Sequence, residues 1–155
     1  MRLLATVVLL AVASPAVAAD ADEDKAKEVA TAFLKAVKAK DLDAVMKTAD
    51  VPFLKDDKGK PKLIEKTEDL KADLKAMLEK ILDADKLPGE VSEALDLPAI
   101  RKLLEGKNAA ADFKTFEKVL GDKGYVVMLG KPGDERGAVF VRIKDGKAKV
   151  VGFPK

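Results

Sequence analysis

The sequence predicts an α+β fold, in which a C-terminal antiparallel meander and a short N-terminal hairpin are covered by N-terminal helices. Residues 124–153 contain three runs of β-branched and aromatic residues that are divided by two turn signals, which is typical of three consecutive strands. The first half of the chain instead places its apolar residues at helical spacing. With 155 residues, the chain is long enough for one domain with its own hydrophobic core.

Residues 1–19 are predicted to be a secretory signal peptide. A positive residue precedes an apolar run at residues 3–12, and a small-x-small motif predicts cleavage after Ala18 or Ala19. The apolar run is roughly half of the ~20 residues that a membrane-spanning helix needs. We therefore expect residues 20–155 to form a single domain, secreted or periplasmic, with no membrane span once the signal is removed.

Three amphipathic helices are predicted before residue 90. The first covers about residues 22–39, and Asp41 is expected to cap a second, short helix. The third is expected to be capped by Thr67-Glu68-Asp69 and to end before Pro88. The apolar positions of the third helix form one stripe, namely Leu70, Leu74, Met77, Leu78, Ile81 and Leu82.

Two short strands are predicted between the second and third helices. Val51 precedes Pro52 and is therefore extended. Residues 56–59 form a turn signal, and residues 62–65 are expected to return as a strand. Because proline cannot donate to a strand ladder, Pro52 and Pro61 place this hairpin at a sheet edge or outside the main sheet.

The segment after Pro88 is expected to contain two further helices. Residues 91–97 fit either a strand or a helical turn. A short helix is expected after Pro98, closed by Gly106, and a second helix around Phe113–Leu120 with Gly121 as its C-terminal cap.

The meander is predicted in register from its second turn. A two-residue Asp145-Gly146 turn pairs Lys144 with Lys147 and Arg142 with Lys149. The further pairs expected are Ile143–Ala148, Val141–Val150, Val139–Gly152, Phe140–Val151 and Ala138–Phe153. One face of this hairpin is wholly apolar and the other is apolar only away from the turn, so the helices are expected to cover both.

Composition excludes several classes of chemistry. The chain has no His and no Cys, which excludes Ser-His-Asp, Cys-His and His-metal sites as well as disulfides. No glycine spacing matches a phosphate-binding loop, and the acids at residues 56–57 and 83–85 lack the rest of a calcium loop. Balanced charge, with 29 basic and 27 acidic residues, one Tyr and no Trp, argues against nucleic-acid binding. We expect no cofactor and no metal.

Two stretches resemble the nuclear transport factor 2-like superfamily, the SnoaL-like or cystatin-like α+β cones. They are Phe33-Leu34-Lys35-Ala36-Val37-Lys38-Ala39-Lys40-Asp41-Leu42-Asp43-Ala44-Val45 and the final hairpin, residues 139–153. The resemblance is strongest to small secreted bacterial members of unknown function and spans most of residues 24–153. It implies a curved antiparallel sheet wrapped on helices into a cone. Similar proteins include ketosteroid isomerases, dehydratases, polyketide cyclases and non-enzymatic binding or dimerisation modules. Their enzymes use a pocket His, or an acid with a Tyr or second acid, and no such residue carries over to this chain.

Three polar residues are candidates for a site. Asp50, next to Val51-Pro52-Phe53, would serve as a general base if held against apolar side chains, or would end a helix or make an Asx turn. Tyr125 would donate to a ligand oxygen, or hold its hydroxyl in water at a strand end. Arg142 would bind an anionic ligand, or extend into solvent near the turn.

The leading hypothesis is an exported, cofactor-free domain that binds a small apolar or amphipathic molecule or interacts with a protein. Its candidate ligand-binding residues are Arg142, Phe33, Phe53 and Phe140. The alternatives are an acid–base enzyme using Asp50 and Tyr125, and a structural homodimer module that uses the exposed face of the meander. The enzyme requires a buried acid that faces a cavity. A cone packed shut by Phe33, Phe53, Phe113, Phe116 and Phe140 would favour the dimer module.

Overall fold

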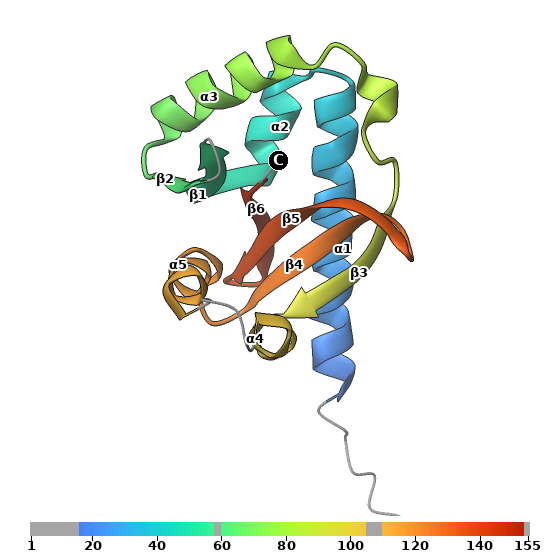
Figure 1. Ribbon diagram of the computed structural model, residues 1–155, viewed down its shortest axis with the longest axis vertical. Coiled ribbons are helices and arrows are strands. Elements are labelled where there is room, and N and C mark those ends of the chain that lie inside the picture. The colour runs from blue at the N-terminus through green and yellow to red at the C-terminus, as the bar shows by residue number, and fades with distance from the viewer. Residues whose placement is uncertain (1–15, 58–59, 105–109, 154–155) are drawn as a thin grey trace, which may run out of the picture.

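The computed structural model describes residues 16–57, 60–104 and 110–153, which form an α+β fold on one curved six-stranded sheet (Figure 1). The strand order is β2-β1-β6-β5-β4-β3. Neighbouring strands are antiparallel, apart from the parallel pair of β1 and β6. The predicted fold class is confirmed. The parallel pair departs from a purely antiparallel sheet, because the start of the N-terminal hairpin joins the last strand of the meander.

Helices α1 (Ala16–Lys38), α2 (Leu42–Thr48) and α3 (Thr67–Lys80) cover one face of the sheet. The first helix thus begins before the predicted residue 22. Asp41 caps α2 as predicted, since its carboxylate accepts a hydrogen bond of 3.0 Å from the Ala44 amide. Thr67 is not a cap but the first helical residue, and Lys66 precedes it without a capping side-chain bond. The apolar stripe of α3 is buried at Leu70, Leu74 and Leu78, while Leu82 lies beyond the helix and is exposed.

The predicted hairpin is formed by β1 (Ala49–Asp57) and β2 (Lys60–Ile64). Strand β2 is one edge of the sheet, as its proline requires. Strand β1 is internal, and it tolerates Pro52 because its ladder with β6 is interrupted between Ala49 and Leu54. Pairing with β2 begins only after the proline, at Phe53.

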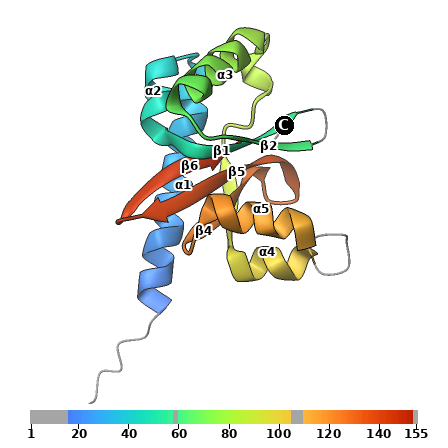
Figure 2. The same cartoon turned by 90° about the vertical axis from the view of Figure 1, so that its left-hand side faces the viewer.

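The other face of the sheet is covered by α4 (Leu97–Leu104) and α5 (Ala110–Leu120), which lie opposite α1 across the strands (Figure 2). The short helix η1 (Ala84–Lys86) and strand β3 (Val91–Asp96) precede them, so the strand interpretation of residues 91–97 is correct. The predicted closure at Gly106 lies outside the described residues. Gly121 ends α5 as predicted, with a φ of +65° and its amide bonded to the Glu117 carbonyl at 2.9 Å.

The meander consists of β4 (Gly124–Lys131), β5 (Asp134–Lys144) and β6 (Lys147–Gly152). Near the Asp145-Gly146 turn the register is as predicted, through Val141 opposite Val150. Beyond that pair the prediction is wrong, because the register shifts and Phe140, not Val139, lies opposite Gly152. A Cβ at residue 152 would lie 2.5 Å from Phe140 Cδ2 and 3.0 Å from the Leu54 carbonyl oxygen. Glycine is therefore required where the Phe140 ring and β1 both close on β6.

Two hydrophobic cores result, one on each face of the sheet. The α1 face buries Phe33 and Phe53 together with Val127, Val139 and Val141. The α5 face buries Leu54, Ile100, Val119, Leu120, Phe140 and Val151, with Phe113 and Phe116 packed against them. The five phenylalanines whose common packing would have favoured the dimer module are thus divided between two cores.

Candidate functional site

Two hollows lie between α3 and the β1–β2 hairpin, and we call them together the α3 groove. The outer hollow, about 560 Å³, lies beside β2 and is lined by Lys55, Lys62, Leu63, Ile64, Glu65, Lys66, Asp69, Ala72, Asp73 and Ala76. The inner hollow, about 330 Å³, is lined by Phe53, Lys55, Asp56, Asp57, Asp73, Leu74, Ala76, Met77, Lys80 and Phe153. Both volumes lie in the range of small-molecule pockets, roughly 300–1,000 Å³.

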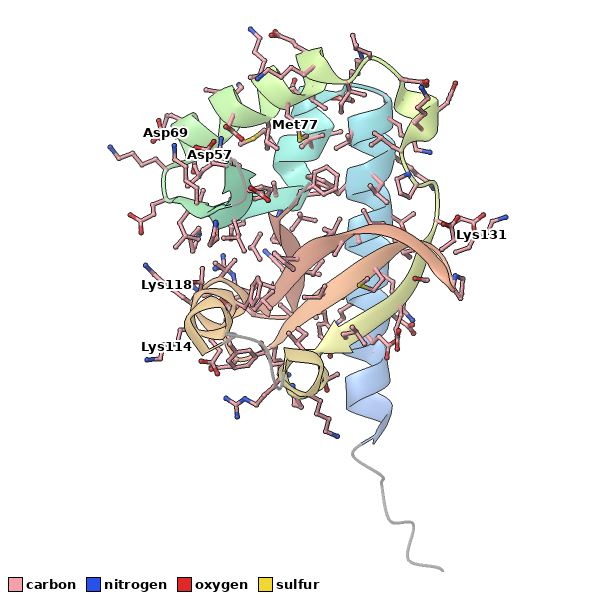
Figure 3. The ribbon with its side chains drawn as sticks, viewed as in Figure 1. Asp57, Asp69, Met77, Lys114, Lys118 and Lys131 are labelled. Carbon is pink, nitrogen blue, oxygen red and sulfur yellow. The ribbon has the colours of Figure 1, made fainter. Side chains whose placement is uncertain are left out.

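The inner hollow combines apolar walls with a charged rim. Phe53 is 2% exposed, and Leu74 is also buried. Met77 on α3 and Phe153 after β6 are partly buried against the same core, and Figure 3 shows Met77 on the helix and Asp57 near the hairpin. Strand alternation explains this arrangement, because it directs Phe53 to the α1 face and Leu54 to the opposite core.

An ion pair between Lys55 and Asp73 lies where the two hollows of the groove meet. The Lys55 ammonium donates to the Asp73 carboxylate, and thereby links β1 to α3. The two side chains are 24% and 31% exposed, and both residues line both hollows. A ligand that separated this pair would join the hollows into one elongated groove.

Asp50 and Arg142 form a second ion pair, on the α5 face. Arg142 Nη2 donates to Asp50 Oδ2 at 2.8 Å and to the Val51 carbonyl at 3.0 Å. Nη1 lies 3.5 Å from the Val119 carbonyl at the end of α5. The Arg142 side chain is 15% exposed and that of Asp50 is 47% exposed. Arg142 is therefore half-buried and bonded within the fold instead of extending into solvent.

Tyr125 lies on the opposite face, in a cleft of about 260 Å³. The residues lining this cleft are Asp22, Asp96, Leu97, Pro98, Asp122, Lys123, Gly124 and Tyr125. Burial raises the pKa of the Tyr125 phenol, and the nearby carboxylates of Asp22, Asp96 and Glu23 raise it further. The phenol is thus neutral and able to donate a hydrogen bond at ordinary pH.

The structure brings together only some of the residues singled out in the sequence. Phe53 lines the α3 groove, and Phe33 supports it from below, with its ring 5.6 Å from that of Phe153. Phe140 lies in the other core, with its ring 5.3 Å from that of Phe116.

Asp50 and Tyr125 do not form one site. Tyr125 pairs with Val141 in the meander and contacts the α1-face core, whereas Asp50 binds Arg142 on the α5 face. Among the described residues no acidic side chain is buried, although the enzyme hypothesis needs one.

Sequence reasoning missed Lys55, Asp73 and the rest of the α3 groove. Pairing of Lys55 with Lys62 could have been read from the hairpin turn. Asp73 lies beside the apolar stripe of α3, but nothing in the sequence shows which part of the hairpin that helix faces. The contact joins residues 18 positions apart, and it depends on how α3 packs on β1.

Neither a metal centre nor a transmembrane helix is found in the part of the chain that the structure describes. Across residues 16–57, 60–104 and 110–153, no group of three or more acidic side chains is placed to hold a metal ion. No helix in these ranges is both long and apolar enough to cross a membrane.

Comparison with known proteins gives one similarity in structure. No protein-family model matches the chain, and no curated protein matches it. A crystal structure of an NTF-2-like protein of unknown function from Shewanella oneidensis MR-1 is similar to 84% of this chain and 95% of its own, with 14% sequence identity and a TM-score of 0.39.

Proposed function

We propose that this protein is an exported domain that binds a small amphipathic molecule in the α3 groove. The observation that carries the proposal is the inner hollow, which is lined by apolar residues, among them Phe53, Met77 and Phe153, and by five charged residues, so that it offers both kinds of contact that an amphipathic ligand needs. Binding pockets for small molecules are typically apolar with a few polar groups that orient the ligand. Export is supported by the predicted signal peptide.

The packing around the groove supports this role. Its floor is provided by the α1-face core, in which Phe33 and Phe53 are buried. Its upper wall is α3, which is held on the core by Leu70, Leu74 and Leu78. The ligand therefore needs to displace only the partly exposed Lys55–Asp73 pair to extend along the groove.

The proposal is tested by native mass spectrometry on the protein purified from its export host. We expect an added mass on the folded protein that is lost on denaturation. The mass of the denatured chain also reports whether residues 1–18 or 1–19 have been removed. A folded protein of the chain's own mass, with no binding of added alkyl amphiphiles, would contradict the ligand proposal.

Two matched variants locate the bound molecule. Ala76 is exposed on α3 and lines both hollows, so Ala76→Trp fills the groove. Ala32 is exposed on α1 and lines neither hollow, so Ala32→Trp adds the same side chain elsewhere. We expect loss of the added mass in the first variant alone; equal retention in both would place the ligand outside the α3 groove.

A further inference from the structure

The outer hollow contains two lysines that face each other across the hairpin. Lys55 on β1 pairs directly with Lys62 on β2, and both line the hollow. Like charges at directly opposed positions of an antiparallel pair repel each other. The sequence thus places an unfavourable pair on the wall of a pocket, where an anion would relieve the repulsion.

The remaining charges in this hollow favour an anion. Asp73 is bound by Lys55, and Glu65 faces Lys118 of α5 at 3.7 Å. Among the residues that the structure describes, Lys62 and Lys66 have no ion partner. Asp69, the third acid that lines this hollow, has none either. The charges that are not already paired therefore have a positive balance.

Apolar surface lies on the other side of the Lys55–Asp73 pair. The inner hollow is lined by Met77 and Phe153, with Phe53 buried behind them, and by the charged residues Lys55, Asp56, Asp57, Asp73 and Lys80. A molecule that placed an anionic group near Lys55 and Lys62 would direct an apolar chain into this hollow. Its anionic group would compete with the Asp73 carboxylate for the Lys55 ammonium.

We propose that the α3 groove binds an amphipathic anion, with its carboxylate or similar head group between Lys55 and Lys62 and its apolar chain against Phe53 and Met77. This inference rests on the proposed function and adds the charge and orientation of the ligand. On binding, the head group displaces the Asp73 carboxylate from the Lys55 ammonium.

Calorimetric titration with three probes that share one alkyl chain tests the head-group charge. Decanoate and decylammonium are added to the full mature protein below their micellar concentrations, and decanol below its solubility limit. We expect decanoate to bind most tightly. Equal or tighter binding of decylammonium or decanol would overturn the inference and leave the proposed function intact, whereas no binding of any probe would contradict both.

Charge-removing substitutions with opposite expected effects test the orientation. Lys62→Gln should weaken decanoate binding by about three- to fivefold, because it removes one solvent-exposed charge. Asp73→Asn should strengthen it by a similar factor, because Lys55 no longer has a competing carboxylate. Lys131→Gln, on the far edge of the molecule in Figure 3, is the matched control and should change nothing.

The opposite signs exclude a merely structural effect. Loss of fold would weaken decanoate binding in whichever variant it occurred, so it cannot produce the gain expected for Asp73→Asn. Thermal unfolding is measured for each variant. If Lys62→Gln leaves decanoate affinity at the wild-type value, or Asp73→Asn lowers it in a folded protein, the assignment of the head group to this lysine pair is wrong.

Discussion

Replacing Arg142 with methionine should destabilise the fold even without any ligand. The guanidinium holds the start of β1 to the end of α5, through the Val51 carbonyl at 3.0 Å and the Val119 carbonyl at 3.5 Å. Methionine retains most of the apolar stem of the side chain but has no donor. The variant therefore isolates the polar contacts from the packing of the stem.

The magnitude follows from the three contacts. The charge-assisted bond to the Val51 carbonyl contributes about 1.5 kcal/mol, and the longer one to Val119 about 0.5 kcal/mol. The ion pair with Asp50 contributes only about 0.5 kcal/mol, because that carboxylate is 47% exposed and screened by solvent. We expect a loss of about 2–3 kcal/mol in the free energy of unfolding, or a fall in Tm of about 6–10 °C.

The assay is urea unfolding of the wild type, Arg142→Met, Asp50→Asn and the double variant. Asp50→Asn should cost about 0.5 kcal/mol, and the double-mutant cycle should give a coupling energy of a similar size. An Arg142→Met variant as stable as the wild type would refute this reasoning and make Arg142 available as a ligand-binding cation. An Asp50→Asn loss as large as that of Arg142→Met would show that the ion pair, and not the backbone contacts, dominates.

Two further predictions concern Gly152 and Tyr125. Gly152→Val should lower the unfolding free energy by about 2–3 kcal/mol, because its Cβ would lie 2.5 Å from the Phe140 ring; an unchanged urea midpoint would contradict this. Tyr125 is the only tyrosine, so its ultraviolet titration reports one phenol, and half-ionisation should occur above pH 10. Since the folded state holds this proton more tightly than the unfolded state, stability should be unaffected below about pH 10 and fall as pH rises through the folded pKa. Asp22→Asn should lower that pKa, and a titration unchanged by this substitution would contradict the assigned cause.

The elements set by local signals could be predicted from the sequence. The Asp145-Gly146 turn fixes the near end of the final hairpin, because both residues adopt positive φ, +52° and +73°. Asp41 fixes the start of α2 through a bond within its first turn. Such signals act over a few residues, and they do not require the rest of the fold.

The features that were not predicted depend on contacts between distant segments. The register shifts beyond Val141, where β1 pairs with Gly152 from outside the meander. Likewise, the division of the phenylalanines between two cores depends on α4 and α5 covering the second face of the sheet. Neither contact produces a periodic pattern in the sequence of a single helix or strand, so neither could be predicted from one.

The candidate site was predicted only in part for the same reason. Phe53 was recognised from its apolar setting, and it lines the α3 groove. Lys55 and Asp73 form an ion pair only because α3 packs over the hairpin. In the sequence, each residue lies on a polar face that is typical of solvent exposure. Asp50 and Arg142 were singled out separately, but their bond to each other depends on β1 and β5 approaching α5.

Amide NMR during a decanoate titration tests the central claim, that the α3 groove is the binding site, most directly. We expect the largest shift changes in residues 53–57, 62–66 and 72–80, which border the two hollows. The amides around Tyr125 should serve as an internal control and remain unchanged, because its cleft shares no lining residue with the groove. Changes centred on Tyr125, or no saturable change anywhere, would contradict the assignment of function to the α3 groove.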